Sequence, residues 1–257
     1  MNGKTLIYDG TFDGFLSAVF YVYEYKLYDV FIQNQFSKQE RMFSEKVEIP
    51  TETDKSDRVW KGIKTKAGKA QSYKIYYAFL SERAEVEQIL LDMIRYVFRS
   101  SSNVAKDFSH PSVLEVSKIA KMVGREKHRM EAFVRFKLMK DGIYFANIEP
   151  DFNVLPLISK HFEKRYADQK WLIYDIQRKY GLFYDLEKVD VITMEFPEGF
   201  DFTKTDTAYF AEKEFEFQKL WQNYFKSVNI ASRKNMKLHI QHVPRRYWKY
   251  MSEKLST

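Results

Sequence analysis

The stretch VSKIAKMVGREKHRMEAFVRFK, residues 116–137, has the clearest helical pattern in the chain. At 100° per residue its apolar side chains fall within one arc, which stays in phase across Gly124. The apolar positions of this arc are Val116, Ile119, Ala120, Val123, Met130, Phe133, Val134 and Leu138. Basic side chains occupy the opposite side, at Lys121, Arg125, His128 and Arg135. The pattern predicts one long amphipathic helix that ends at Asp141-Gly142, because glycine often terminates helices.

The same stretch has two alternative interpretations. Its small and apolar positions also resemble a helix-turn-helix, in which residues 126–137 would form the recognition helix in a DNA groove. A sharp turn at Gly124 would not normally preserve the apolar phase, so we favour a single helix. In the second alternative, the charges of a core helix are simply solvated and bind nothing.

The chain of 257 residues carries a formal net charge of +7, and this charge is unevenly distributed. Lys and Arg outnumber Asp and Glu by 18 to 9 in residues 58–142 and by 10 to 4 in residues 207–257. Residues 1–57 and 143–206 each have a net charge of −4. Segregated positive charge suits a phosphate backbone and can steer a polyanion toward a protein. The charge pattern therefore favours nucleic acid as a partner, although many basic proteins bind none.

Several function classes are disfavoured by what the sequence lacks. Cysteine is absent, which excludes disulfides, a thiol nucleophile and thiolate metal sites in this chain. The motifs of zinc proteases, serine hydrolases, P-loop proteins and dinucleotide-binding proteins are absent as well. His239 and His242 have the spacing of a metal pair, but no obvious third ligand lies nearby in the sequence. We therefore expect no metal and no cofactor.

The first residues, MNGKTLIYDG, lack the basic-then-apolar profile of a signal peptide. No apolar run approaches the length of a membrane span. The absence of cysteine fits a reducing compartment. We expect a cytoplasmic protein without a membrane partner.

Periodicity along the rest of the chain predicts a helix-rich α+β protein. In the first half we expect short strands at 4–8, 30–33 and 46–49 and helices at 12–26, 58–79 and 83–98. In the second half a small antiparallel sheet is expected from strands at 143–148, 171–176, 182–186 and 190–196. The sheet is covered by one helix over 153–166. Further helices are expected over 207–228 and in a basic tail interrupted by Pro244.

No long linker or internal repeat divides the chain, so we expect a single compact domain of residues 1–257. The turn-rich run TETDKSD, residues 51–57, is the best boundary in the first half. Pattern and charge indicate a subdivision into a strand/helix unit, a basic helical region, an antiparallel sheet region and C-terminal helices, at 1–57, 58–142, 143–206 and 207–257.

The candidate nucleic-acid contacts are arginines of the basic regions. Arg125, Arg129 and Arg135 would contact phosphates if the long helix binds nucleic acid. In the tail, Arg245 and Arg246 flank aromatic residues that include Trp248, a composition that suits single-stranded or flipped bases. Alternatively, the tail docks its rings on the core and leaves its charged groups in water.

The candidate catalytic residues are His128, His161 and Asp175. These polar residues occur within otherwise apolar-patterned elements, and active sites collect such groups. Asp175 and Arg178 flank a predicted hairpin, where a charge-assisted pair could also simply stabilise the turn.

Several segments together resemble a bacterial family of uncharacterised "probable DNA metabolism" proteins. The segments are YDGTFDGFLSAVF (8–20), EKHRMEAFVRF (126–136), DGIYFANIEPDFNVLPLISKHFEKRY (141–166), WLIYDIQRKYGLFYD (171–185) and QHVPRRYW (241–248). They occur in order over nearly the whole chain. Arg165 and Arg178 belong to these segments and join the candidate nucleic-acid contacts.

The resemblance implies a role in DNA repair or modification beside a radical-SAM protein. Related segments occur fused to uracil-DNA-glycosylase-like domains. This chain has neither the cysteine triad of the former nor a glycosylase domain, so either chemistry would belong to a partner. The resemblance implies no catalytic residues of its own.

Three functions follow as hypotheses. The leading one is a protein that binds single- or double-stranded DNA and is accessory to a partner enzyme. The second is an enzyme that acts on a nucleotide or a DNA base. The third is a protein–protein scaffold for the radical-SAM protein, without nucleic-acid contact.

Overall fold

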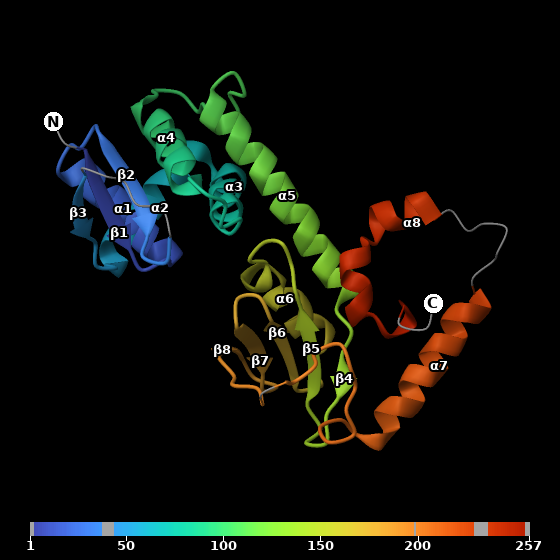
Figure 1. Cartoon of the computed structure of the whole chain (residues 1–257). Coiled ribbons are helices and arrows are strands. Elements are labelled where there is room, and N and C mark those ends of the chain that lie inside the picture. The colour runs from blue at the N-terminus through green and yellow to red at the C-terminus, as the bar shows by residue number, and fades with distance from the viewer. Residues whose placement is uncertain (1–2, 38–43, 198, 229–235, 255–257) are drawn as a thin grey trace. The chain divides into compact units, whose positions relative to one another are not determined.

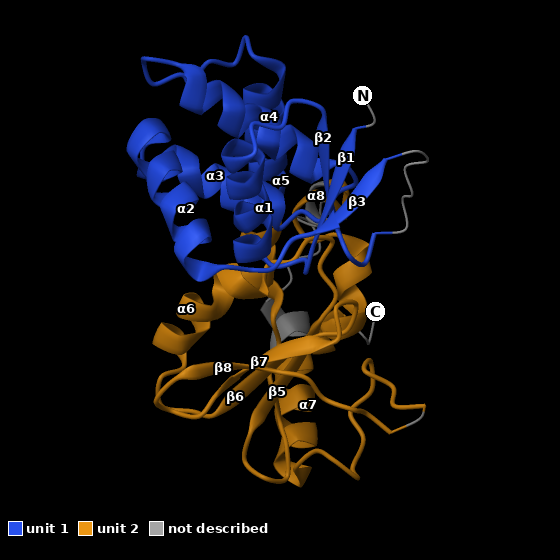
Figure 2. Cartoon of the chain, turned by 90° about the vertical axis from the view of Figure 1, so that its left-hand side faces the viewer, with its two compact units in different colours: residues 1–124 blue, residues 125–257 orange. Residues whose placement is uncertain are grey.

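The computed structural model describes residues 3–37, 44–197, 199–228 and 236–254. The chain divides into two compact units, residues 1–124 and residues 125–257 (Figure 2). Helices and two sheets occur in the order that Figure 1 labels, so the predicted α+β class is confirmed. The boundary falls inside the long helix, and whether the two units form a single domain stays a prediction.

Unit 1 is built on a parallel three-stranded sheet in the order β2-β1-β3. Its strands are β1 (Lys4–Tyr8), β2 (Val30–Asn34) and β3 (Glu45–Glu48). The helix α1 (Phe12–Glu24) connects β1 to β2, as parallel neighbours require. Its first turn is capped by the Thr11 hydroxyl, which accepts a hydrogen bond from the Gly14 amide at 2.9 Å.

Three further helices complete the body of unit 1: α2 (Thr53–Ala67), α3 (Lys69–Phe79) and α4 (Val86–Arg99). The prediction of one helix over 58–79 is wrong, because the chain turns at Gly68 with φ +79°, a left-handed conformation that favours glycine. The residues 53–57, expected as a link, instead form the start of α2. The unit buries the apolar face of α4, including Leu90, Leu91 and Ile94.

The stretch from Pro111 to Phe133 is one uninterrupted helix, α5, and not a helix-turn-helix. Its apolar phase buries Val116, Ile119 and Val123 in the part that belongs to unit 1. The helix ends eight residues before the expected Asp141, because Arg135 Nη1 donates hydrogen bonds to the carbonyls of Ala132 (2.8 Å) and Val134 (3.2 Å). The chain then enters β4 (Lys137–Leu138).

Unit 2 contains a five-stranded sheet in the order β4-β5-β6-β7-β8. The strands after β4 are β5 (Tyr144–Ile148), β6 (Trp171–Asp175), β7 (Tyr180–Tyr184) and β8 (Val189–Ile192). The sheet is mixed and not antiparallel throughout, because β5 and β6 pair in parallel while the other neighbours are antiparallel. The helix α6 (Leu155–Arg165) is the crossover that such a parallel pair needs.

The C-terminal part of unit 2 consists of α7 (Glu212–Val228), α8 (Met236–His242) and two short 3-10 helices, η2 (Arg245–Tyr250) and η3 (Ser252–Lys254). Tyr247 and Glu253 are buried there, at 3 % exposure each. The tail therefore docks part of its side chains inside the unit. Among the described ranges of the chain, no helix combines the length and the apolar character that crossing a bilayer requires.

Candidate functional site

Three of the predicted site residues line one hollow of about 560 Å³ in unit 2. Arg135 follows the end of α5, and His161 and Arg165 come from the last turns of α6. His161 and Arg165 are four residues apart and so lie on the same face of their helix. Trp221 of α7 also lines the hollow, which we call the α5–α6 pocket.

Aromatic rings form much of the wall of the α5–α6 pocket. The Phe136 ring lies 5.2 Å from the Tyr166 ring and 5.7 Å from the Phe162 ring, measured between ring centroids. The Arg165 guanidinium lies over the Tyr166 ring at 5.7 Å. Together with Trp221, these rings offer flat apolar surfaces beside the exposed guanidinium of Arg165.

The two arginines of this pocket differ in their partners. Arg135 donates to one Glu253 oxygen from Nε at 3.1 Å and from Nη2 at 2.8 Å. Burial acts to raise the pKa of Glu253, but the hydrogen bonds from Arg135 and Trp221 outweigh it and lower the pKa overall. Arg165 is exposed and forms no ion pair with a described carboxylate. Arg165 is therefore the cation of the pocket that can bind an external anion.

Glu131 holds a second group of polar side chains at the edge of the pocket. Its carboxylate accepts a hydrogen bond from Lys127 Nζ at 2.5 Å. The Nδ1 atoms of His128 and His161 each lie 3.8 Å from a Glu131 oxygen. Two of the three candidate catalytic residues thus face one carboxylate.

Asp175, the third candidate, belongs to a different arrangement. It is fully buried at the end of β6 and accepts a hydrogen bond from Arg178 Nη1 at 2.9 Å. Burial raises the pKa of Asp175, although the Arg178 guanidinium acts in the opposite direction. In the described part of the chain, Asp175 has no hydrogen bond or ion pair with His128 or His161. The three candidates therefore do not share one set of contacts.

A buried carboxylate, Glu126, collects two more of the predicted arginines. Arg246 Nη2 lies 3.2 Å and Arg129 Nη1 3.4 Å from Glu126 Oε2, and the Tyr247 hydroxyl donates to Oε1. The amide of Asp151 also donates to Oε1, at 3.0 Å. Desolvation and the nearby Glu126 raise the pKa of Tyr247. This network joins α5, the segment after β5 and the C-terminal tail.

The remaining predicted contacts lie outside the α5–α6 pocket. Arg125 is exposed on α5. Arg245 lines a smaller hollow of about 360 Å³ with Arg246, Lys249 and the carboxylates of Glu149 and Asp151. Trp248 donates from its indole to the Val243 carbonyl at 3.0 Å, and its ring lies 5.9 Å from the Arg245 guanidinium. Trp248 thus helps to dock the tail, while Arg245 stays an exposed cation.

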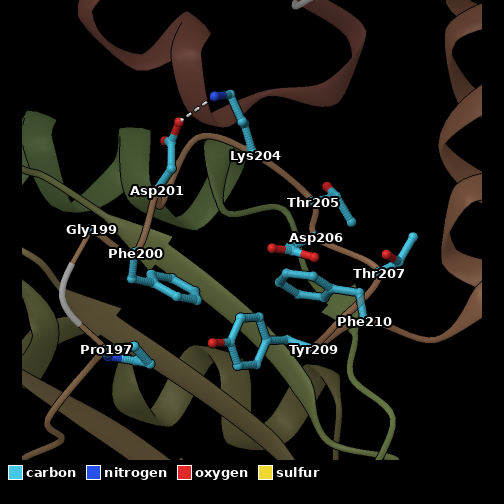
Figure 3. A pocket seen from close by; sticks show the side chains of 10 residues that line it. All are labelled: Pro197, Gly199, Phe200, Asp201, Lys204, Thr205, Asp206, Thr207, Tyr209 and Phe210. Carbon is cyan, nitrogen blue, oxygen red and sulfur yellow. Dashed lines mark ion pairs between the residues drawn. The ribbon is translucent and has the colours of Figure 1, made fainter.

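Another hollow of unit 2, of about 580 Å³, is lined by Pro197 and by residues between Gly199 and Phe210 (Figure 3). The rings of Phe200 and Tyr209 meet edge to face there, with centroids 5.4 Å apart. Asp201 is bound to Lys204 at 3.2 Å, and hydrogen bonds from Thr203 lower the pKa of Asp201 to about 2. The two charged groups Asp201 and Lys204 are thus already paired with each other, which makes this hollow a weaker candidate.

The prediction of no metal stays untested. Among the described residues, His, Asp and Glu side chains form no group of three or more that could hold a metal ion. The side chain of His239, half of the possible metal pair, lies outside the described side chains.

Sequence reasoning missed Glu131, Tyr166, Trp221 and Glu253 as parts of the site. Glu131 has a local signal, because it follows Lys127 by four residues and His128 by three on the same helix. Tyr166 directly follows Arg165. Trp221 and Glu253 come from distant parts of the chain, and no local pattern points to them.

Comparison with known proteins places this site in a family. The family model "Domain of unknown function (DUF4130)" matches residues 84–253. The chain belongs to this family. The DUF4130 region includes every residue named for the α5–α6 pocket. No curated protein matches the chain.

One solved structure similar to this chain is described as "pGpG-specific phosphodiesterase - PggH from Vibrio cholrae". The two share 11% sequence identity with a TM-score of 0.36, over 71% of this chain and 81% of that chain. At this TM-score the likeness supports no statement about the fold or activity of the DUF4130 protein.

Proposed function

We propose that unit 2 binds DNA and that the α5–α6 pocket holds one nucleotide of the strand. The observation that carries this proposal is the exposed, carboxylate-free Arg165 beside His161 and the rings of Tyr166 and Trp221, all in one hollow. The family resemblance supports DNA as the nucleic acid. The role is DNA repair or modification, with the chain accessory to a partner enzyme.

The chemistry of the pocket suits a nucleotide. A hollow of about 560 Å³ lies within the range of small-ligand sites. A guanidinium presents a planar fork of donors that matches phosphate oxygens. Aromatic rings stack with any base, so such a site binds single strands with little sequence preference.

The predicted arginines fall into two groups under this proposal. Arg125, Arg165 and Arg245 contact phosphates. Arg129, Arg135, Arg178 and Arg246 instead pair with carboxylates of unit 2 and hold the site in shape. Trp248 supports the tail that carries Arg245.

Fluorescence anisotropy with a labelled single-stranded oligonucleotide tests the proposal. Binding should weaken as salt rises, because phosphate contacts release counterions. Arg165→Ala should weaken binding about 10-fold, as expected for one phosphate and stacking contact. Lys160→Ala is the matched control, since Lys160 is an exposed cation of the same helix that does not line the pocket. No binding at low salt, or equal loss in the two variants, would overturn the proposal.

An enzyme acting on a nucleotide is the second candidate function, supported by the placement of His128 and His161 on either side of Glu131. One histidine would exchange a proton with the substrate, and Glu131 would orient that histidine. Chromatography of nucleotides and damaged bases after incubation with the protein measures turnover. Turnover that is lost in His161→Gln but retained in Asp175→Asn would select this function. No turnover over a panel of such substrates would exclude it.

A radical-SAM protein remains the proposed partner. Its support is the family resemblance alone. Co-expression of the two chains followed by size-exclusion chromatography should give one co-eluting species. A complex that forms without any DNA binding by this chain would favour the scaffold function.

A further inference from the structure

Unit 1 contains an apolar groove between α3 and α5, with a volume of about 640 Å³. Its walls are the rings of Tyr73 and Tyr77 on α3, and its small lining residues include Ala70 and Ala120. Lys74 of α3 and Lys121 of α5 also line it, one from each helix. We call it the α3–α5 groove. None of its residues belongs to the α5–α6 pocket.

The groove has the dimensions of a helix-binding site. Its α3 residues occupy positions 70, 73, 74 and 77, which follow one face of the helix for two turns, or about 10 Å. Small side chains along the lining let another backbone approach closely.

Apolar surface around the groove is left open to solvent. Tyr73 is 45 % exposed, and Phe108, whose ring lies 5.7 Å from Lys74 Nζ, is 49 % exposed. Exposed aromatic side chains beside an apolar groove are typical of surfaces that bind partners.

The charges of the groove specify what can occupy it. Lys74 and Lys121 form no ion pair with a described carboxylate, and Lys74 Nζ donates only a long hydrogen bond of 3.4 Å to Ser117 Oγ. An occupant with carboxylates on both edges would pair with both lysines. A nucleic-acid strand fits less well, because it carries a phosphate on every nucleotide while the groove offers one lysine on each helix and an apolar lining between them.

We propose that the α3–α5 groove binds an acidic amphipathic helix of a partner protein. The helix would insert apolar side chains spaced i, i+3, i+4 and i+7 between the tyrosines, in the helix-in-groove mode of recognition. Glu or Asp residues on its two flanks would pair with Lys74 and Lys121. The interaction is independent of nucleotide binding in unit 2.

The test uses the full chain and two labelled helical peptides. Both carry leucines at the i, i+3, i+4 and i+7 positions; one has glutamates on both flanks and the other has lysines. By anisotropy, the glutamate peptide should bind with saturation and the lysine peptide should not. Ala70→Glu, at an exposed position of the groove, should weaken binding of the glutamate peptide about 10-fold or more through like-charge repulsion.

A charge exchange supplies the decisive control. The double variant Lys74→Glu, Lys121→Glu should no longer bind the glutamate peptide and should bind the lysine peptide instead. Lys61→Glu with Lys69→Glu changes the net charge equally at exposed positions outside the groove and should leave binding unchanged. Circular dichroism confirms that each variant is folded. The proposal would be overturned if no peptide bound with saturation or if both peptides bound equally. It would also be overturned if the groove variants lost only oligonucleotide binding and kept peptide binding.

Discussion

Replacing Arg178 with alanine removes the cation that faces a fully buried carboxylate. Asp175 has 0 % exposure, and the Arg178 side chain is only 10 % exposed. Besides its bond to Asp175, Arg178 donates to the carbonyls of Pro150 at 3.1 Å and Asp151 at 3.3 Å. The side chain thus holds the segment after β5 against the end of β6.

The cost of Arg178→Ala follows from the charge left behind. Removing one member of a buried pair typically costs about 3–5 kcal/mol, because the other charge stays buried without its partner. The amides of Gln177 and Arg178 still donate to Asp175, at 2.9 and 3.1 Å, and they limit the loss. We therefore expect about 3 kcal/mol, a large share of the about 5–15 kcal/mol that stabilises a typical domain.

Unfolding in guanidinium chloride, monitored by tryptophan fluorescence, measures this loss of stability. Three of the four tryptophans lie in unit 2, and Trp171 is fully buried there. Burial already raises the pKa of Asp175, and loss of Arg178 raises it further. The loss of stability should therefore be largest above this pKa and shrink as the pH falls and Asp175 takes up a proton.

Two further variants control this experiment. Asp175→Asn combined with Arg178→Met removes both charges and should recover much of the stability. Arg125→Ala, an exposed arginine of the same unit, should change stability by less than about 0.5 kcal/mol. A loss below about 1 kcal/mol for Arg178→Ala, or one that does not depend on pH, would refute the structural role of the pair.

Three other substitutions test separate features of the two units. Gly181→Ala should destabilise unit 2 by about 1–3 kcal/mol in chemical denaturation, because a Cβ at this position would lie 2.8 Å from a backbone carbonyl oxygen of β6. Tyr247→Phe should cost about 1–3 kcal/mol in the same assay, since the hydroxyl donates to the buried Glu126 carboxylate. Glu87 accepts a hydrogen bond from the Tyr8 hydroxyl at 2.9 Å, and burial raises the pKa of Glu87. The contribution of Glu87 to the stability of the folded state is therefore lost as the pH rises through that pKa. Glu87→Gln should therefore flatten the pH dependence of amide hydrogen-exchange protection in unit 1, and an unchanged slope would contradict this.

The elements that were predicted well depend on local patterns. The apolar phase across Gly124 predicted a single helix there, and α5 is continuous through that residue. The strands β1, β2, β5 and β6 were expected within one residue of their observed ends. The errors occurred where a single residue overrides the pattern, as Gly68 does with its positive φ and Arg135 does by bonding carbonyls at the end of α5.

Sequence periodicity by itself determined the α+β class and the positions of most helices and strands. The reason is that side chains three to four residues apart share a face of a helix, and side chains two residues apart share a face of a strand. Charge, composition and the family resemblance also singled out arginines and histidines as candidate site residues, and their role in function stays a prediction. Only the tertiary structure decided what these residues contact: Arg135 pairs with Glu253, 118 residues away, and Arg246 with Glu126, 120 residues away. Arg165 has no such partner among the described carboxylates. The physical reason is that helix formation depends on neighbours along the chain, whereas the partner of a charge depends on which distant segments fold beside it.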